Sequence, residues 1–165
     1  MADAGDLMSY INYWLYARGL HPMFIAAQNY TDHEVRLVGE WYGGVNAVDK
    51  KGRCPVHCAV IKGNSDVIEA LSLLGADLDA VDHKGRTAMH FAAQTRSPVE
   101  TVEMLLELGS YTYWSPDDYG NTPRDYLTPA HAAQIDDFLS SRSVLETLKI
   151  ARGIHRCVAA RRRVE

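Results

Sequence analysis

The feature that most constrains the fold of this chain is an internal repeat with a period of 33 residues. The stretch that begins at Asp49 reads DKKGRCPVHCAVIKGNSDVIEALSLLGADLDAV, and the stretch that begins at Asp82 reads DHKGRTAMHFAAQTRSPVETVEMLLELGSYTY. His57 in the first copy aligns with His90 in the second. A repeat of this length indicates small supersecondary units, each of which buries its apolar face against its neighbours. Folds of this kind usually bind other molecules and seldom catalyse reactions.

The register continues weakly in both directions. Gly19 lies 33 residues before Gly52, and Gly120 lies 35 residues after Gly85, which indicates an insertion of two residues. Helical spacing of apolar residues predicts two short helices in each unit, with glycines at their ends. The predicted organisation is an N-terminal capping helix over residues 1–18, about four repeats over 19–140 with the outer two divergent, and a basic C-terminal helix or tail over 141–165.

Two copies of a short motif carry a family resemblance. They read Cys54-Pro55-Val56-His57-Cys58-Ala59, followed by Gly75-Ala76-Asp77-Leu78-Asp79, and Thr87-Ala88-Met89-His90-Phe91-Ala92. They resemble the ankyrin repeat, whose signature is Thr-Pro-Leu-His-x-Ala followed by Gly-Ala-x-x-Asn/Asp. Partial copies stand at Thr122-Pro123-Arg124-Asp125 and at His21-Pro22-Met23-Phe24-Ile25-Ala26. The resemblance covers roughly residues 15–140 and implies an all-α solenoid of helix-turn-helix units with protruding finger loops.

The resemblance assigns structural roles to the motif residues, which are Cys54, Pro55, His57, Gly75, Thr87, His90 and Gly109. Thr87 is expected to cap its helix, and His90 to bond to the first helical turn and to a neighbouring loop. Cys54 replaces the capping threonine, which should cost repeat two roughly 0.5–1 kcal/mol. Asp125 stands where the motif has histidine, which puts the bonding of repeat four to its neighbours in doubt.

The sequence offers no catalytic or metal-binding pattern. The spacing Cys54-x-x-His57-Cys58 resembles part of a zinc site. However, residues on one helical turn cannot by themselves place four ligands tetrahedrally around the metal, and no second ligand pair follows. No nucleophile elbow, zincin, phosphate-loop or dinucleotide motif is present. We therefore expect no enzyme activity, no cofactor, no metal and no small-molecule substrate.

Charge is distributed unevenly along the chain. Residues 1–140 hold ten Lys or Arg and 19 Asp or Glu, whereas residues 141–165 hold seven and two. The acidic body argues against nucleic-acid binding by the whole domain. Three cysteines that cannot all pair indicate a reducing compartment. The N-terminus does not resemble a signal peptide, and no apolar run is long enough for a membrane span. The expected location is intracellular, cytoplasmic and/or nuclear.

In the ankyrin family, the turns and the first helices line a concave groove. By register, the candidate contact positions in repeats two and three are Lys50, Lys51, Arg53, Lys62, His83, Lys84, Arg86 and Gln94. A local excess of positive charge on an acidic body would attract an acidic or phosphorylated segment of a partner protein. The predicted function is a non-catalytic protein–protein interaction module, an adaptor or scaffold. The alternative is a rigid structural subunit of a larger assembly, contacting through the third finger and the basic tail.

Three further features leave alternatives open. Tyr113 and Trp114 fill the enlarged third finger and are either an interface anchor or loop packing. The segment 141–165 is a cap helix, a partner-binding helix or a localisation or nucleic-acid patch. Asn46 stands at the finger base, where members of the family can be oxygenase substrates, although a turn-stabilising role is favoured. Asp117 and Asp118 give the third finger the opposite charge, so a partner could be bound in one direction.

Overall fold

The computed structural model describes residues 21–141, and every regular element in that range is helical. The helices are α2 (Pro22–Asn29), α3 (Asp32–Tyr42), α4 (Pro55–Lys62), α5 (Ser65–Leu73), α6 (Ala88–Ala92), α7 (Pro98–Glu107), the 3-10 turn η1 (Pro123–Tyr126) and α8 (Pro129–Ser141). The predicted capping helix over 1–18 and the tail beyond Ser141 lie outside the described residues. The chain divides into two compact units, the first ending at Asp77 and the second beginning at Leu78.

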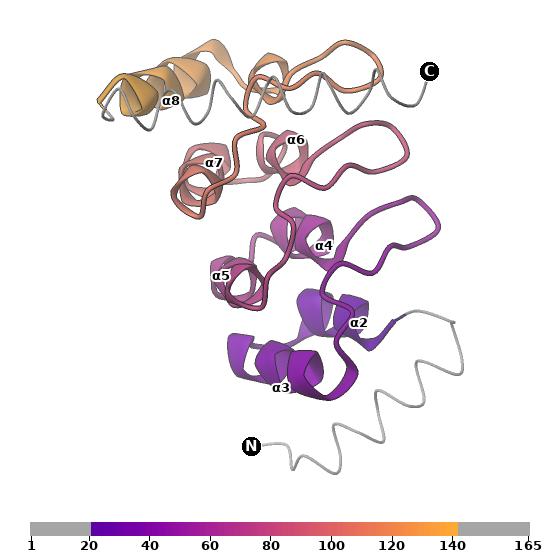
Figure 1. The fold of residues 1–165 in the computed structure, drawn as a ribbon. Helices are drawn as coiled ribbons and strands as arrows, with labels where there is room; N and C mark the ends of the chain where they lie inside the picture. Colours follow the sequence, from indigo (N-terminus) through magenta and orange to yellow (C-terminus); the bar gives the residue numbers. More distant parts are fainter. Residues whose placement is uncertain (1–20, 142–165) are drawn as a thin grey trace. The chain divides into compact units, whose positions relative to one another are not determined.

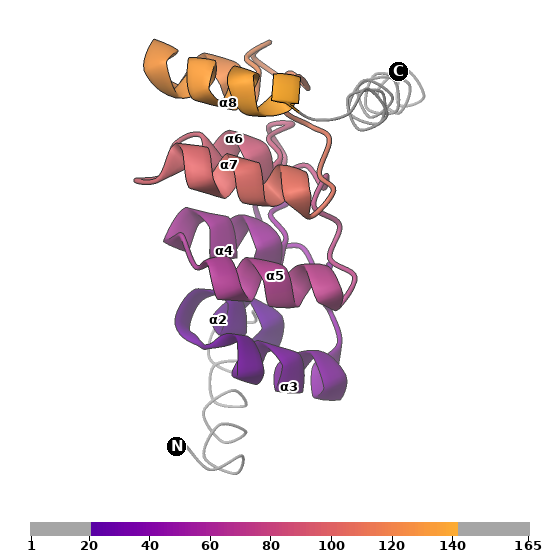
Figure 2. The ribbon, with the colours of Figure 1, turned by 90° about the vertical axis from the view of Figure 1, so that its left-hand side faces the viewer.

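Unit 1 contains two helical pairs. Helix α2 packs against α3 and α4, and helix α5 packs against α3 and α4, as the two ribbon views show (Figures 1 and 2). The facing sides bury apolar side chains completely, among them Met23, Val35, Ile68 and Leu71. Because no single pair of such short helices can bury its own apolar face, the packing of one pair on the next supplies the core.

Local sequence signals fix where the helices of unit 1 begin and end. At the start of α3, the Thr31 N–H donates to Glu34 Oε2 at 2.9 Å. At the start of α5, Asn64 Oδ1 accepts from the Val67 N–H at 3.3 Å. Gly63 follows α4 with φ +70°, a left-handed conformation that residues with a Cβ adopt only at a cost. The sequence therefore separates the two helices of this pair by itself.

In unit 2, α6 packs against α7 and η1, and α7 packs against α8. Its completely buried side chains include Met89, Leu105 and Ile135. The first helix expected in repeat four is only the single 3-10 turn η1. Pro129 follows soon after this turn. Because helical geometry is unfavourable for the residue before a proline, here Thr128, the turn does not continue into a longer helix.

Within residues 21–141, no helix combines the length and the apolar character that crossing a membrane would require.

Candidate partner-binding site

Three finger loops protrude beside the helices (Figure 1), and the first two carry most of the candidate contact residues. Each of the three loops is built around one aspartate. In the first finger, residues 48–53, the aspartate is Asp49. Its Oδ1 accepts the backbone N–H groups of Lys51 at 2.8 Å and Arg53 at 2.9 Å. Its Oδ2 accepts Nε and Nη2 of Arg53 at 2.9 and 2.7 Å. A carboxylate that takes four such donors holds the turn closed.

The second finger, residues 81–86, repeats this arrangement around Asp82. Oδ1 accepts the N–H groups of Lys84 and Arg86, both at 2.9 Å, and Oδ2 accepts Nε and Nη2 of Arg86 at 3.0 and 2.7 Å. The Asp82 side chain is 1% exposed, against 9% for Asp49. Burial by itself would raise the pKa of Asp82, but the bonds from Arg86 and from the backbone outweigh it, so the pKa lies below its ordinary value.

The third finger, residues 116–121, keeps the aspartate and changes its partner. Asp117 Oδ1 accepts the N–H groups of Tyr119 and Asn121 at 2.9 and 3.0 Å, and Oδ2 accepts the Tyr126 hydroxyl at 2.7 Å instead of an arginine. Asp117 is buried. It is therefore a turn-forming residue, and only Asp118 places a carboxylate on the exposed part of this finger.

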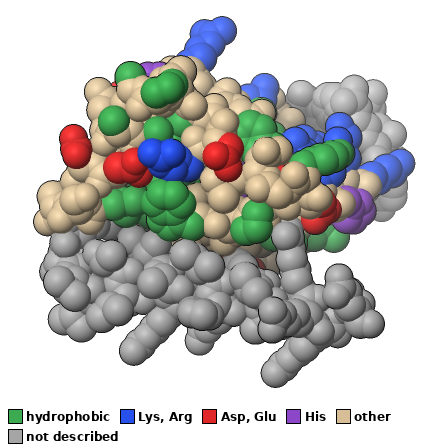
Figure 3. Space-filling model, turned by 90° about the horizontal axis from the view of Figure 1, so that it is seen from above, with side chains coloured by type: hydrophobic (Ala, Val, Ile, Leu, Met, Phe, Trp, Pro, Cys, Tyr) green, Lys and Arg blue, Asp and Glu red, His purple; other side chains and the backbone are tan. Residues whose placement is uncertain are grey.

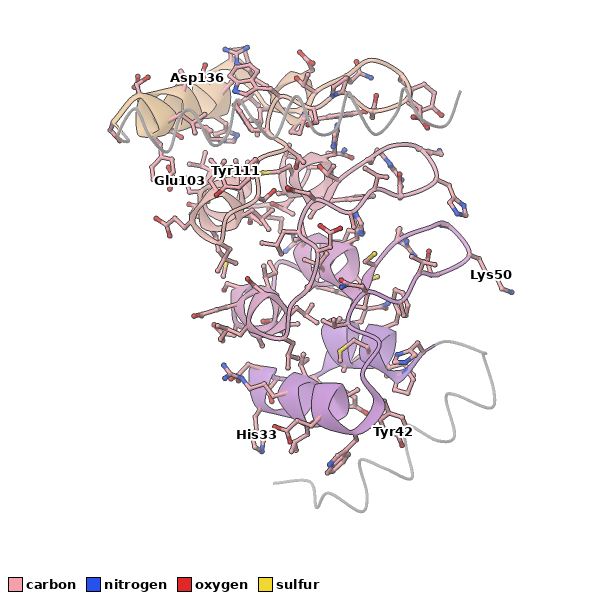
Figure 4. The ribbon with its side chains drawn as sticks, viewed as in Figure 1. His33, Tyr42, Lys50, Glu103, Tyr111 and Asp136 are labelled. Atoms are coloured by element: carbon pink, nitrogen blue, oxygen red, sulfur yellow. The ribbon has the colours of Figure 1, made fainter. Side chains whose placement is uncertain are left out.

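These contacts divide the predicted contact residues of repeats two and three into two groups. Arg53 and Arg86 are tied to the aspartates of their own fingers, and the Arg86 guanidinium also lies 4.5 Å from the centroid of the Phe91 ring. They shape the fingers instead of presenting free charge. The exposed candidates are Lys50, Lys51, Lys62, His83, Lys84 and Gln94. Figure 4 shows Lys50 at the end of its finger, with its side chain pointing away from the helices.

The two aromatic candidates of the enlarged third loop differ in exposure. Tyr113 is completely buried, and its ring meets the Trp114 ring edge-on at 4.9 Å. Burial and the nearby Asp136 raise the pKa of Tyr113 to about 12. Trp114 is 39% exposed and lies 5.8 Å from the Arg124 guanidinium, which pairs with Asp136 at 2.8 Å. Tyr113 is therefore a core residue and offers no surface to a partner.

The motif residues of unit 2 form a continuous hydrogen-bond network. His90 Nδ1 accepts from the Thr87 N–H at 3.0 Å, which leaves the proton of the neutral ring on Nε2. Nε2 then donates to the carbonyl of Asn121 at 3.1 Å, a bond that joins α6 to the third finger. Thr112 Oγ1 donates to Thr87 Oγ1 at 3.1 Å. Both bonds expected of His90, to the first helical turn and to a neighbouring loop, are therefore present.

Asp125 reproduces only half of this arrangement. Its Oδ2 accepts the N–H and the hydroxyl of Thr122, each at 2.7 Å, so the local capping contact survives the replacement of histidine. The aspartate side chain is shorter than that of histidine, and its carboxylate has no proton to donate at pH 7, so it cannot also donate to a distant carbonyl.

A family model described as ankyrin repeats, in three copies, matches residues 6–113. The chain belongs to the ankyrin repeat family. The all-α ankyrin-repeat solenoid predicted from the sequence is thus confirmed as the fold class. Ankyrin repeats are generally protein–protein interaction modules and are generally non-catalytic. The assignment of residues 19–140 to four repeats stays a prediction.

Similar ankyrin segments occur in much larger proteins of different kinds. The chain is 39% identical over 89 residues to "Putative palmitoyltransferase ZDHHC13" of Danio rerio, covering 53% of this chain and 14% of that protein. It is 30% identical over 115 residues to "Putative ankyrin repeat protein FPV014" of Fowlpox virus, covering 67% and 24%. It is 31% identical over 100 residues to alpha-latrotoxin-Lt1a of Latrodectus tredecimguttatus, covering 60% and 7%. The chain spans less than a quarter of the length of each relative.

At the base of the first two fingers, a polar side chain links one repeat to the next. In unit 1, Asn46 accepts the Asp77 N–H at 2.8 Å and donates to the Gly75 carbonyl at 3.2 Å. In unit 2, Asp79 accepts from the Ser110 hydroxyl and the Tyr111 N–H at 2.8 and 3.2 Å. The structural role favoured for Asn46 agrees with these two bonds.

The corresponding finger-base position of the third finger is occupied by tryptophan. Trp114 lies three residues before Asp117, just as Asp79 lies three before Asp82. Its indole can donate one hydrogen bond and accept none, so it cannot make the paired link that Asn46 makes.

Cys54, at the N-cap of α4, and Cys58, within α4, are both buried. Burial raises the pKa of both thiols, which makes them poor nucleophiles and poor metal ligands. Among residues 21–141, no three His, Cys, Asp or Glu side chains are grouped so that they could hold a metal ion.

Replacing Cys54 tests the capping role assigned to this position. The Cys54 N–H donates to His57 Nδ1 at 2.9 Å, just as the Thr87 N–H donates to His90, so only the side-chain hydroxyl is missing. We expect Cys54→Thr to raise the free energy of unfolding by about 0.5–1 kcal/mol, measured by urea denaturation. Cys54→Val, which has the shape of threonine without its hydroxyl, is the control. Equal stability of the two variants would contradict the capping role.

Proposed function

We propose that this ankyrin-repeat chain is a non-catalytic adaptor or scaffold that captures an acidic or phosphorylated segment of a partner protein. The contact residues are the exposed basic side chains of the first two fingers. They are Lys50 and Lys51 in unit 1 and His83 and Lys84 in unit 2. Lys62 and Gln94, exposed on the same repeats, extend the contact.

The observation that carries this proposal is that the arginine of each of the first two fingers forms an ion pair with the aspartate of the same finger. Asp49 and Asp82 take the guanidinium groups of Arg53 and Arg86, so the carboxylate in each finger is already satisfied. The lysines beside them are exposed and form no ion pair with an acid among residues 21–141, so another molecule can reach them. The first finger carries three cationic side chains and one carboxylate, and the second carries two and one.

The setting of these charges favours specific steering. The body of the chain is acidic, so an acidic segment is repelled over most of the surface and attracted at the fingers. The turn bonds to Asp49 and Asp82 fix the backbone of each finger before binding. A finger whose backbone is already fixed loses less conformational entropy when a ligand arrives.

Charge reversal at the fingertips tests the proposal. We would select a random peptide display library on the wild-type chain and measure the enriched peptides by fluorescence anisotropy. We expect them to be rich in Asp and Glu, and Lys50→Glu with Lys84→Glu to weaken their binding about tenfold or more, which corresponds to about 1.4 kcal/mol. Raising the salt concentration should weaken wild-type binding, because exposed charges are screened over about 10 Å at 0.1 M salt.

The matched control is Arg36→Glu with Arg96→Glu, which makes the same change in net charge at exposed positions outside the fingers. Equal loss of binding in both double variants would mean that net charge alone drives the association, and the fingertip proposal would fail. Enriched peptides without acidic residues, bound equally at high and low salt, would also overturn it.

A salt-tolerant complex would instead support the alternative of a rigid subunit in a larger assembly. That function calls for a broad apolar surface. On the face seen in Figure 3, hydrophobic side chains are interrupted by charged and other polar groups. Such interruption is ordinary for a protein surface, so this view gives the alternative no support.

A further inference from the structure

Tyr119 is the most exposed large hydrophobic side chain among the described residues, at 70%. It stands two residues after Asp117, the position that Lys51 and Lys84 hold after Asp49 and Asp82. An aromatic ring thus replaces a cation at equivalent points of successive fingers. Exposed tyrosines are frequent binding hot spots, because the ring offers a large contact area at a small entropic cost.

The backbone around Tyr119 is held in place, so the ring is presented from a fixed point. Its N–H donates to Asp117 Oδ1 at 2.9 Å, and Asp117 is fixed in turn by the Tyr126 hydroxyl. The pKa of Asp117 lies below its ordinary value, because these bonds outweigh the effect of its burial, so the carboxylate that closes the turn is charged at neutral pH.

A direct backbone bond joins this fingertip to the second one. The Asp118 N–H donates to the Lys84 carbonyl at 3.0 Å, and both fingers belong to unit 2. The exposed side chains of His83, Lys84 and Tyr119 therefore start from adjacent stretches of backbone. One extended segment of a partner could contact all three, since each of its residues spans about 3.3 Å.

We propose that the fingertip pair of unit 2 recognises a composite element, in which an acidic residue lies beside a proline or an aromatic residue. Lys84 and His83 take the acidic group. The Tyr119 ring stacks on the neighbouring ring, and this contact excludes water from the charge pair and strengthens it. This inference rests on the proposed function and adds the second half of the recognised motif.

The test uses synthetic peptides and the full chain. One peptide carries two glutamates followed by phenylalanine, a second carries two glutamates followed by serine, and a third carries phenylalanine without glutamate. We expect the first to bind at least five times more tightly than either of the others, measured by fluorescence anisotropy. Tyr119→Ala should remove this advantage over the second peptide, whereas Lys84→Ala should weaken the first peptide without removing the advantage of the ring.

Tyr119→Leu keeps apolar area without a ring face and is expected to restore only part of the preference. Tyr111→Phe, which keeps the ring at a less exposed tyrosine of the same unit, is the control and should leave all three affinities unchanged. If both glutamate peptides bind equally and Tyr119→Ala changes neither, this inference fails while the proposed function stands. If no glutamate peptide binds more tightly than the third, both fail.

Discussion

We expect Asp82→Ala to lower the free energy of unfolding by about 3 kcal/mol. The substitution deletes a carboxylate that accepts four donors between 2.7 and 3.0 Å and is 1% exposed. It leaves the Arg86 guanidinium only 24% exposed and without its acid, and removing one partner of a buried ion pair is strongly destabilising. Urea denaturation followed by circular dichroism measures the change.

Two related substitutions separate the effects of charge and of burial on the stability that Asp82→Ala removes. Asp82→Asn keeps an oxygen for the N–H groups of Lys84 and Arg86 but removes the charge, so it should cost less than Asp82→Ala. Asp49→Ala removes the same bonds from the first finger, where the carboxylate is more exposed, and should also cost less. If Asp49→Ala and Asp82→Ala were equally mild, the fingers would be folded by the helices alone and the turn network would be incidental.

The pH dependence of this network has a defined sign. The pKa of Asp82 in the folded chain lies below its ordinary value of 3.8. The unfolded chain therefore binds this proton first as the solution is acidified. The stability that the carboxylate contributes is present above pH 3.8 and is lost as the pH falls through the folded pKa. The difference between wild type and Asp82→Ala should shrink over the same interval.

The sequence predicts best those parts of the molecule that are held by contacts between residues close together in the chain. The start of α6 could be foreseen, because Thr87 and His90 lie three residues apart, a spacing that brings the two residues together on a first helical turn. The exposed lysines could be foreseen for the same reason, since turn residues point outward. Counting Arg53 and Arg86 as free charges overlooked the aspartates four residues before them.

The burial of Tyr113 could have been predicted from the alignment of the repeats alone. It lies four residues before Asp117, as Leu78 lies four before Asp82, and Leu78 is buried. The alignment of finger aspartates therefore marks Tyr113 as a core position. The hydroxyl obscures this in the sequence, because a buried tyrosine hydroxyl usually has a hydrogen-bond partner, and that of Tyr113 has none among the described residues. The Tyr126–Asp117 bond could not have been found in this way, since no other finger has its counterpart.

His90→Ala should be comparably damaging, with a loss of about 3 kcal/mol at pH 7. The imidazole is completely buried and bridges the Thr87 N–H and the Asn121 carbonyl, so alanine leaves a cavity and two unsatisfied backbone groups. His83→Ala, at an exposed fingertip, is the control and should leave stability within about 0.5 kcal/mol of wild type.

The loss caused by His90→Ala should become smaller in acid, which an ordinary cavity would not explain. Burial holds the pKa of His90 below its ordinary value of 6.5, more strongly than the bond to Asn121 and the charge of Asp117 raise it. As the pH falls from 7 to 5, the unfolded chain gains a proton that the folded ring resists. Wild type then loses stability by up to about 1.4 kcal/mol per pH unit that the variant does not lose. A difference that stays constant over this range would contradict this prediction, because it would mean that the folded ring takes up its proton over the same pH range as the ring in the unfolded chain.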